Sequence, residues 1–286
     1  MHDTPLFYIN DLTLVIRVDS EVDREKMKDL VFIGTGGSVA TEDRDNTSFL
    51  LLDRETAVLV DCPGSVIQKL KKVSVDPRHV RALIITHIHP DHIYGLPSLV
   101  HSLMLNECVI EVFGSELSVG FCADLLDLFN LRREKVKCRV KFIPVMEGEN
   151  YRIFPNTDCA FYKVPHSPSS MAVGFQDCED GKNLLYSGDT PSFPQLLKKM
   201  PDIDYLIHDC SAPSWVFKEY PSLYAMHTDS LTLGEMALQA GVRHLIPCHF
   251  FGEIEFSILE IEEEIRKNFR GKLTIPEDFS RIPLKT

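Results

Sequence analysis

Short apolar runs alternate with polar turns along most of the chain. A continuous apolar run between turn residues predicts a buried strand, whereas apolar positions at three- and four-residue intervals predict an amphipathic helix. Strands are predicted at residues 31–33, 48–52, 57–61, 81–86, 109–113, 139–143, 159–164, 171–175, 183–186, 205–208 and 245–248. Helices are predicted at residues 64–73, 96–105, 116–129, 194–199, 231–240 and 257–268. Many strands interleaved with a few helices indicate two packed sheets that outer helices cover.

The first 29 residues stand apart from this body. Residues 12–18 read as a strand, and residues 20–30 read as a short charged helix or linker. We therefore divide the chain into an N-terminal extension, residues 1–29, and one domain, residues 30–286. No stretch rich in proline, glycine and serine divides that domain further.

Composition changes this picture by excluding classes of protein. The chain has 286 residues, of which 44% are hydrophobic and 25% charged, as in ordinary globular enzymes. No apolar run approaches the roughly 20 residues that cross a bilayer, and the first residues do not resemble a signal peptide. None of the eight cysteines forms a Cys-x-x-Cys pair, which favours free thiols in a reducing compartment. We expect a cytoplasmic protein without a membrane partner.

The formal net charge of −12 makes the chain strongly acidic. Because a negative surface repels phosphate polymers, this charge leads us to expect that extended nucleic acid is not a partner. Two local basic clusters, at residues 69–72 and 132–135, are interpreted as solvated helix faces, as most such clusters are.

The strongest chemical signal is the loop Thr86–His92, which holds three histidines and an aspartate directly after an apolar run. Packing does not explain so many polar side chains at the end of a buried strand. Imidazole and carboxylate in the pattern His-x-His-x-Asp-His suit a first-row metal, zinc above all, and one such loop can reach two ions. Two bridged metal ions generate hydroxide and clamp the oxygens of a displacement reaction. The loop therefore predicts a binuclear metallohydrolase.

Other strand ends must supply the remaining ligands. His166, Asp189 and His249 each follow a predicted strand. Taken singly, a histidine at a strand end is usually an ordinary surface or hydrogen-bonded residue, and an aspartate after a glycine usually marks a turn. Taken together, four strand ends with suitable ligands indicate one metal centre. The neighbouring cysteines are interpreted as packing residues, with thiolate ligation by Cys248 as the minor alternative.

These loops together resemble the ribonuclease Z-like branch of the metallo-β-lactamase fold superfamily. The resemblance covers about residues 31–252 and is carried by Asp61 within residues 59–64, the histidine loop, His166, Asp189 and His249. It implies an α/β fold, the four-layer αββα sandwich of the metallo-β-lactamase type, in which residues 30–286 form the hydrolase domain. Members of the branch commonly dimerise, so the resemblance also implies a homodimer.

By this resemblance, seven side chains hold two divalent metal ions per chain. The ligands of the first ion would be His87, His89 and His166, those of the second Asp91, His92 and His249, and Asp189 would bridge both. Zinc is the default metal, and manganese or iron also suits such ligands. Asp91 is in addition a candidate catalytic base. Asp61 is expected to orient a ligand histidine through its free ring N–H.

Two further features match this branch. Residues 34–38, Gly-Thr-Gly-Gly-Ser, followed by residues 46–48 resemble its first loop. Asp209 and His227 match a pair of residues, usually glutamate and histidine in the family, that form an acid pair near the scissile phosphate. The aspartate is shorter, so its reach to His227 is an open question. The alternative for His227 is that it caps the helix that begins near Thr228 or Ser230.

The resemblance implies phosphodiester hydrolysis, with His227 as general acid and Asp209 as its partner. Ribonuclease Z recognises tRNA through a long arm inserted between positions like His166 and Asp189, but only 23 residues separate these two here. We therefore expect a small phosphodiester, either a cyclic nucleotide or a short oligonucleotide. The alternatives are a ribonuclease Z-type tRNA 3′-processing endonuclease, a hydrolase of lactones or thioesters, and a non-catalytic module.

Overall fold

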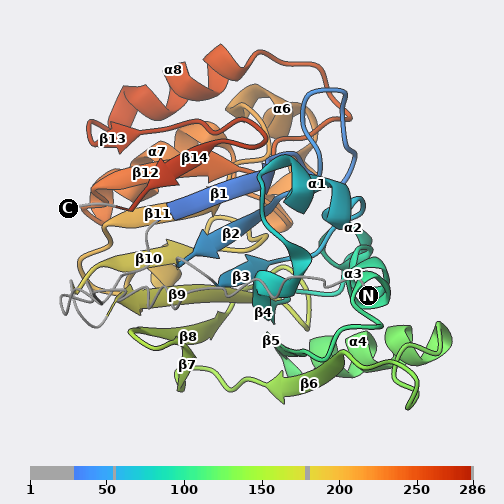
Figure 1. Ribbon diagram of the computed structural model, residues 1–286. Helices are drawn as coiled ribbons and strands as arrows, with labels where there is room; N and C mark the ends of the chain where they lie inside the picture. Colours follow the sequence, from blue (N-terminus) through green and yellow to red (C-terminus); the bar gives the residue numbers. More distant parts are fainter. Residues whose placement is uncertain (1–28, 54–55, 178–180, 285–286) are drawn as a thin grey trace, which may run out of the picture.

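Two seven-stranded sheets pack face to face in the computed structural model, which describes residues 29–53, 56–177 and 181–284 (Figure 1). In spatial order the first sheet contains β14 (Arg281–Pro283), β1 (Asp29–Gly34), β2 (Ser48–Leu52), β3 (Ala57–Val60), β4 (Val80–Ile84), β5 (Val109–Gly114) and β6 (Arg139–Pro144). The second sheet contains β13 (Lys272–Leu273), β12 (His244–Cys248), β11 (Tyr205–Asp209), β10 (Asn183–Tyr186), β9 (Met171–Asp177), β8 (Thr157–Lys163) and β7 (Asn150–Phe154).

Helices cover the outer face of each sheet. The first sheet carries α1 (Val66–Lys72), α2 (Pro90–Ile93), α3 (Leu96–Ser102) and α4 (Glu116–Leu128), with the short 3₁₀ helix η1 (Pro77–His79). The second sheet carries α5 (Pro194–Leu197), α7 (Ser230–Gln239) and α8 (Ile258–Asn268). The helix α6 (Ser214–Glu219) packs against α7 and the 3₁₀ helix η2 (Pro221–Ala225) in a small cluster of its own. The predicted αββα sandwich is therefore confirmed.

The layers follow from the alternation of side chains along buried strands. In β1, Leu30 and Phe32 enter the core between the sheets, while Val31 and Ile33 enter the core under the helices of the first sheet. A third core joins the outer face of the second sheet to α5, α7 and α8. Strands that are buried on both faces have continuous apolar runs, which is why most of them could be predicted from the sequence.

Several elements escaped the sequence analysis. Strand β7 alternates exposed and half-buried residues, so it has no apolar run, and β13 and β14 are too short to give a pattern. The six residues of α6 also lack a helical repeat. Strand β14 closes the first sheet by pairing antiparallel with β1, which brings the two ends of the described chain side by side (Figure 1).

The basic cluster at residues 69–72 departs from its expected role. Lys69 is only 3% exposed, and its Nζ lies 2.9 Å from Asp45 Oδ2. The interpretation as a solvated helix face is therefore wrong for Lys69, because a loop 24 residues upstream in the sequence brings a carboxylate to it. Lys72 lies over the ring of Phe279, 3.9 Å from its centroid.

The predicted strand at residues 12–18 lies outside the described residues, as does the N-terminal extension apart from Asp29, which opens β1. The domain division stays a prediction. In the part of the chain that the structure describes, no helix combines the length and the apolar character needed to cross a bilayer.

Candidate metal centre

Six strand ends meet at one edge of the sandwich. Strands β3 and β4 run parallel in the first sheet, and β10, β11 and β12 run parallel in the second. Strand β8 has the direction of β10, because both pair antiparallel with β9. Carboxyl ends of parallel strands gather at the same edge of a sheet, where ligands of such folds bind. All the candidate ligands follow these strand ends.

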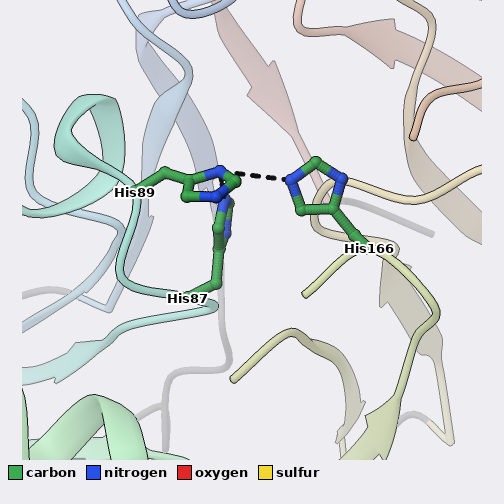
Figure 2. Close-up of side chains that lie close together, drawn as sticks. All are labelled: His87, His89 and His166. Atoms are coloured by element: carbon green, nitrogen blue, oxygen red, sulfur yellow. Dashed lines mark hydrogen bonds between the residues drawn. The ribbon is translucent and has the colours of Figure 1, made fainter. Parts of the chain in front are cut away.

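The first group of ring nitrogens belongs to His87, His89 and His166. His89 Nδ1 lies 3.0 Å from His87 Nε2 and 3.2 Å from His166 Nε2, and Figure 2 shows the three rings turned toward one another. The second nitrogen of His166 is engaged elsewhere, since Nδ1 lies 2.9 Å from the carbonyl oxygen of Met226. An Nδ1–H that donates to this carbonyl leaves the Nε2 lone pair facing the other two rings, which is the form that a metal needs.

The second group contains Asp91, His92, Asp189 and His249, all buried. Asp189 Oδ2 lies 3.0 Å from His249 Nε2 and 3.3 Å from His92 Nε2. The same oxygen lies 3.7 Å from His87 Nε2 and 3.9 Å from His166 Nε2, so this carboxylate stands between the two groups. The structure thus brings together all seven of the side chains predicted to be ligands.

Three buried atoms of the second group, His92 Nε2, His249 Nε2 and Asp189 Oδ1, have no hydrogen-bond partner of acceptable geometry among the described residues. Leaving buried polar atoms unpaired costs about 1–3 kcal/mol each, so such atoms require another explanation. A cation that accepts their lone pairs provides one. The nitrogen and oxygen donors also match the preferences of zinc, manganese and iron.

Electrostatics at the second group favours positive charge. Burial alone would raise the pKa of Asp189, but His249 and His92 hold that pKa well below its ordinary value. Burial alone would lower the pKa values of His92 and His249, but the carboxylates beside them, Asp189 first, raise both well above the ordinary value. In the first group, burial and the neighbouring His92 lower the pKa of His87. The cluster therefore binds positive charge, either as protons or as a cation.

Asp61 contacts the candidate ligands of the first sheet on the side away from the centre. Its Oδ2 is 2.8 Å from His92 Nδ1, and its Oδ1 accepts from the Thr86 backbone N–H at 2.8 Å. The Thr86 hydroxyl also reaches both Asp61 oxygens and lies 3.1 Å from His87 Nδ1. One carboxylate and one hydroxyl thus contact the outer nitrogens of two candidate ligands. Sequence analysis identified Asp61 but missed Thr86, which no pattern distinguishes from any other threonine.

Asp209 and His227 form the corresponding contact in the second sheet. His227 Nδ1 lies 2.8 Å from Asp209 Oδ2, so the shorter aspartate does reach the ring. The His227 ring stacks on His249 at 5.2 Å between centroids and 18° between planes, and its side chain remains 13% exposed. Asp229, rather than His227, caps α7, because its side chain accepts from the Thr232 backbone N–H at 2.9 Å.

The glycine-rich loop at residues 34–38 passes close to this centre. A Cβ on Gly37 would lie 3.4 Å from His249 Cε1 and 3.2 Å from the Phe251 ring. A Cβ on Gly34 would overlap the Asn46 carbonyl oxygen at 1.9 Å. The glycines therefore allow the loop to approach the His249 side of the site. Asn46 holds the loop in place, because its Nδ2 donates to the Gly37 carbonyl at 2.6 Å.

Two non-glycine residues of the site have left-handed backbone conformations, Asp61 with φ 57° and His249 with φ 67°. Such conformations are uncommon outside glycine and cluster at functional sites. Cys248, the alternative ligand, is fully buried in the core between the sheets, where burial raises the pKa of its thiol well above the ordinary value. A neutral thiol does not favour ligation by Cys248.

Comparisons with known proteins agree with this geometry. A sequence profile of the family described as anti-Pycsar protein Apyc1 matches residues 28–230, more than half of the chain. The chain belongs to the anti-Pycsar protein Apyc1 family. Ribonuclease Z of Methanosarcina acetivorans is 24% identical over 304 residues, which cover 89% of this chain and 97% of that protein.

Two solved structures share the fold. The metallo-β-lactamase fold protein YhfI from Bacillus subtilis superimposes with a TM-score of 0.75 at 20% identity, covering 90% of this chain and 99% of that one. The short form of human tRNase Z gives a TM-score of 0.72 at 20% identity, covering 90% of this chain and 100% of that one. The chain is a metal-dependent hydrolase of the ribonuclease Z-like branch of the superfamily, so the predicted family is confirmed.

The same relatives correct one expectation. We expected from the charge of −12 that extended nucleic acid is not a partner, but relatives across nearly the whole chain are named ribonuclease Z and tRNase Z, and tRNA is an extended nucleic acid. That expectation is contradicted. Net charge sums over the whole surface, whereas nucleic acid contacts only the part around the site, so the sum does not exclude such a partner.

Proposed function

We propose that this chain hydrolyses phosphodiester bonds and that its substrate is a small phosphodiester, such as a cyclic nucleotide or a short oligonucleotide. The observation that carries the proposal is the hydrogen-bonded pair Asp209–His227, whose imidazole stacks against the candidate ligand His249. An acid beside a binuclear centre suits a reaction whose leaving oxygen needs a proton. Hydrolysis of a thioester, whose thiolate leaves readily, has less need of such a residue.

The proposed ligands of a first cation are His87, His89 and His166, those of a second cation are Asp91, His92 and His249, and Asp189 would contact both. When bound, two such cations would lower the pKa of a water and neutralise charge on phosphate oxygens. Asp91 is proposed mainly as a ligand. Burial opposes ionisation of its carboxyl, but His92 and His249 hold its pKa well below the ordinary value, which makes it a weak base.

The proton for the leaving oxygen would come from His227. Asp209 accepts from Nδ1–H, which leaves Nε2 as the ring atom that can carry the transferable proton. The buried carboxylate fixes the orientation of the imidazole. Asp209 is itself held by the Thr190 backbone N–H, 3.1 Å from Oδ2, so neither member of the pair depends on solvent for its position.

Substrate size is the finer part of the proposal. His166 and Asp189 are joined through the antiparallel pair β9 and β10, and a 23-residue separation does not accommodate a long arm. A tRNA 3′-processing endonuclease is the second candidate, favoured by the relatives named ribonuclease Z. Zinc, a homodimer and a cytoplasmic location remain further proposals; the seven cysteines in the described part of the chain are all free thiols, in accord with a reducing compartment.

A substrate panel tests the proposal. The metal-loaded protein would be assayed with bis-p-nitrophenyl phosphate, several cyclic nucleotides, a tRNA precursor with a 3′ trailer, and a lactone. We expect turnover of the phosphodiesters, with cyclic nucleotides or short oligonucleotides as the best substrates. Preferred cleavage of the tRNA precursor would select the second candidate. Turnover of the lactone alone would contradict phosphodiester hydrolysis. Elemental analysis of the same preparation would give the number and kind of ions.

A further inference from the structure

A buried serine joins the metal centre to the acid pair. Ser211 is fully buried, and its Oγ lies 2.7 Å from Asp209 Oδ1 and 3.4 Å from His249 Nδ1. It therefore contacts a candidate ligand of the second cation and the partner of the candidate general acid. Neither the sequence motifs nor the resemblance gave this residue a role.

The direction of the two hydrogen bonds follows from their chemistry. An ionised carboxylate only accepts, so the Ser211 hydroxyl donates to Asp209. The hydroxyl oxygen then has its lone pairs available for the Nδ1–H of His249. A histidine protonated at Nδ1 keeps its lone pair on Nε2, and this Nε2 lies 3.0 Å from Asp189 Oδ2 and 3.6 Å from Asp91 Oδ2. The serine thus favours the tautomer of His249 that binds a metal.

The main chain of Ser211 spans the same two segments. Its backbone N–H donates to the carbonyl of Thr228, next to His227, at 3.1 Å. Its carbonyl accepts from the backbone N–H of Phe251, two residues after His249, at 2.8 Å. These bonds fix the serine relative to both histidines, so its side chain has little freedom to choose other partners.

The first sheet contains the same arrangement with other residues. There the hydroxyl of Thr86 contacts the carboxylate of Asp61 and Nδ1 of His87, and Asp61 also contacts His92. A buried hydroxyl between a carboxylate and the outer nitrogen of a candidate ligand therefore occurs twice in one site. Repetition on an unrelated pair of loops argues that the contact serves the ligands rather than local packing.

We propose that Ser211 is a positioning residue that couples His249, and through it the second cation, to the Asp209–His227 pair. The series of contacts His249–Ser211–Asp209–His227 forms a closed ring, because its first and last members stack with ring centroids 5.2 Å apart. Loss of the hydroxyl would remove a contact from the His249 ring and another from the Asp209 carboxylate. The inference rests on the proposed function for its catalytic half, whereas its ligand half concerns cation binding alone.

The variant Ser211→Ala tests both halves with separate measurements. Titration of the metal-depleted protein with Zn²⁺ against a competing chelator gives the affinity for each cation without any assay of activity. We expect the second Zn²⁺ to bind about 10–100-fold more weakly, as with other losses of a partner behind a ligand. Turnover of aryl methyl phosphates with p-nitrophenyl and phenyl leaving groups reports on the acid. We expect a larger loss for phenyl, the leaving group that needs the proton.

Matched variants control the result. Ser211→Thr keeps the hydroxyl and should restore both measurements toward the wild type. Ser118→Ala removes another buried hydroxyl, which lies on α4 and contacts the N-cap residue Ser115, and should change neither. Ser211→Cys keeps a side chain of similar shape while weakening both hydrogen bonds, so it repeats the test if the alanine variant does not fold.

The outcomes separate this inference from the proposed function. Unchanged Zn²⁺ affinity in Ser211→Ala would overturn the role at His249. Weaker Zn²⁺ binding with an unaltered dependence on the leaving group would overturn the coupling to the acid pair. If the wild type hydrolyses no phosphodiester, the proposed function fails, and with it the catalytic half, while the Zn²⁺ titration still decides the ligand half.

Discussion

The two sheets end in similar polar clusters that carry different histidines. In both, a buried carboxylate accepts from a hydroxyl and contacts a histidine Nδ1: Asp61 with Thr86 and His92, and Asp209 with Ser211 and His227. His92 is 1% exposed and faces three carboxylates, whereas His227 is 13% exposed and stacks on the edge of the centre. The same kind of support therefore holds a buried candidate ligand in one sheet and a partly accessible candidate proton donor in the other.

The difference in burial suits the two histidines to different proposed roles. A histidine surrounded by carboxylates and shielded from water is suited to hold a cation, because nothing else compensates those charges. A histidine at the border can meet a substrate oxygen that enters from solvent. If this comparison is right, replacing each histidine in turn should give one variant that loses metal and another that keeps metal but loses turnover.

The largest effect is expected from His92→Ala and His227→Ala. His92→Ala should lose the second cation and almost all activity, because a ligand is removed. His227→Ala should keep both cations and lose activity by about 10²–10⁴-fold, the usual contribution of a general acid. Elemental analysis and turnover of a phosphodiester measure the two properties. Unchanged turnover in His227→Ala would remove its role as acid, and loss of metal there would make it a ligand instead.

The two carboxylates that contact these histidines, Asp61 and Asp209, allow a second test of the comparison. Asp61→Asn should weaken cation binding by about 10–100-fold, because it disturbs the partners of two ligands. Asp209→Asn should leave the first cation bound and reduce turnover of a substrate with a poor leaving group. Chelator competition gives the affinities, and circular dichroism checks the fold. Equal effects of the two variants on both measurements would mean that the two clusters do not differ in role.

The sequence predicted the ligands better than their supports. The seven candidate ligands could be found because histidine and aspartate directly after apolar strands stand out in the sequence. Thr86 and Ser211 could not, because hydroxyl residues are common and their partners come from other strands. Ser211 meets His249 only because β11 and β12 are neighbours, with Asp209 opposite Cys248 in the register. Such contacts depend on the order of strands in the sheet, which no local pattern encodes.

The fold likewise contains elements that a local sequence pattern predicts and elements that it does not. Buried strands such as β2 and β10 were predicted with their observed bounds, because burial on both faces gives continuous apolar runs. Strand β7 and helix α6 were missed, because neither has a run or a repeat of its own. Lys69 was misread because its partner, Asp45, is brought to it by a distant loop. The structure of β7, of α6 and of the surroundings of Lys69 depends on tertiary contacts rather than on a local pattern.

The affinity for cations should depend on pH. The raised pKa values of His92 and His249, caused by the carboxylates around them against the effect of burial, mean that protons occupy the ligands that a cation needs. Binding must release these protons, so affinity falls as pH falls. We expect about tenfold weaker Zn²⁺ binding per unit of pH below neutrality for each proton released. Calorimetry in buffers of different ionisation enthalpy counts the protons, and a count of zero would contradict the pKa directions.

The smallest effect concerns His244, the histidine of β12. His244 opens the strand that His249 follows, and burial first, then the charge of Lys272, lowers its pKa to about 4. In the unfolded chain the group would titrate near its ordinary value of 6.5. Above that pH both states are neutral and stability is unaffected. As pH falls from 6.5 toward 4, the unfolded state gains a proton that the folded state refuses, so stability declines. The loss should be on the order of 2 kcal/mol or less.

His244→Gln should flatten this part of the profile of melting temperature against pH without changing turnover at pH 7. A profile that keeps its slope in the variant would assign the decline to other groups and leave His244 as a neutral partner of Thr274, whose Oγ1 lies 2.8 Å from its Nε2.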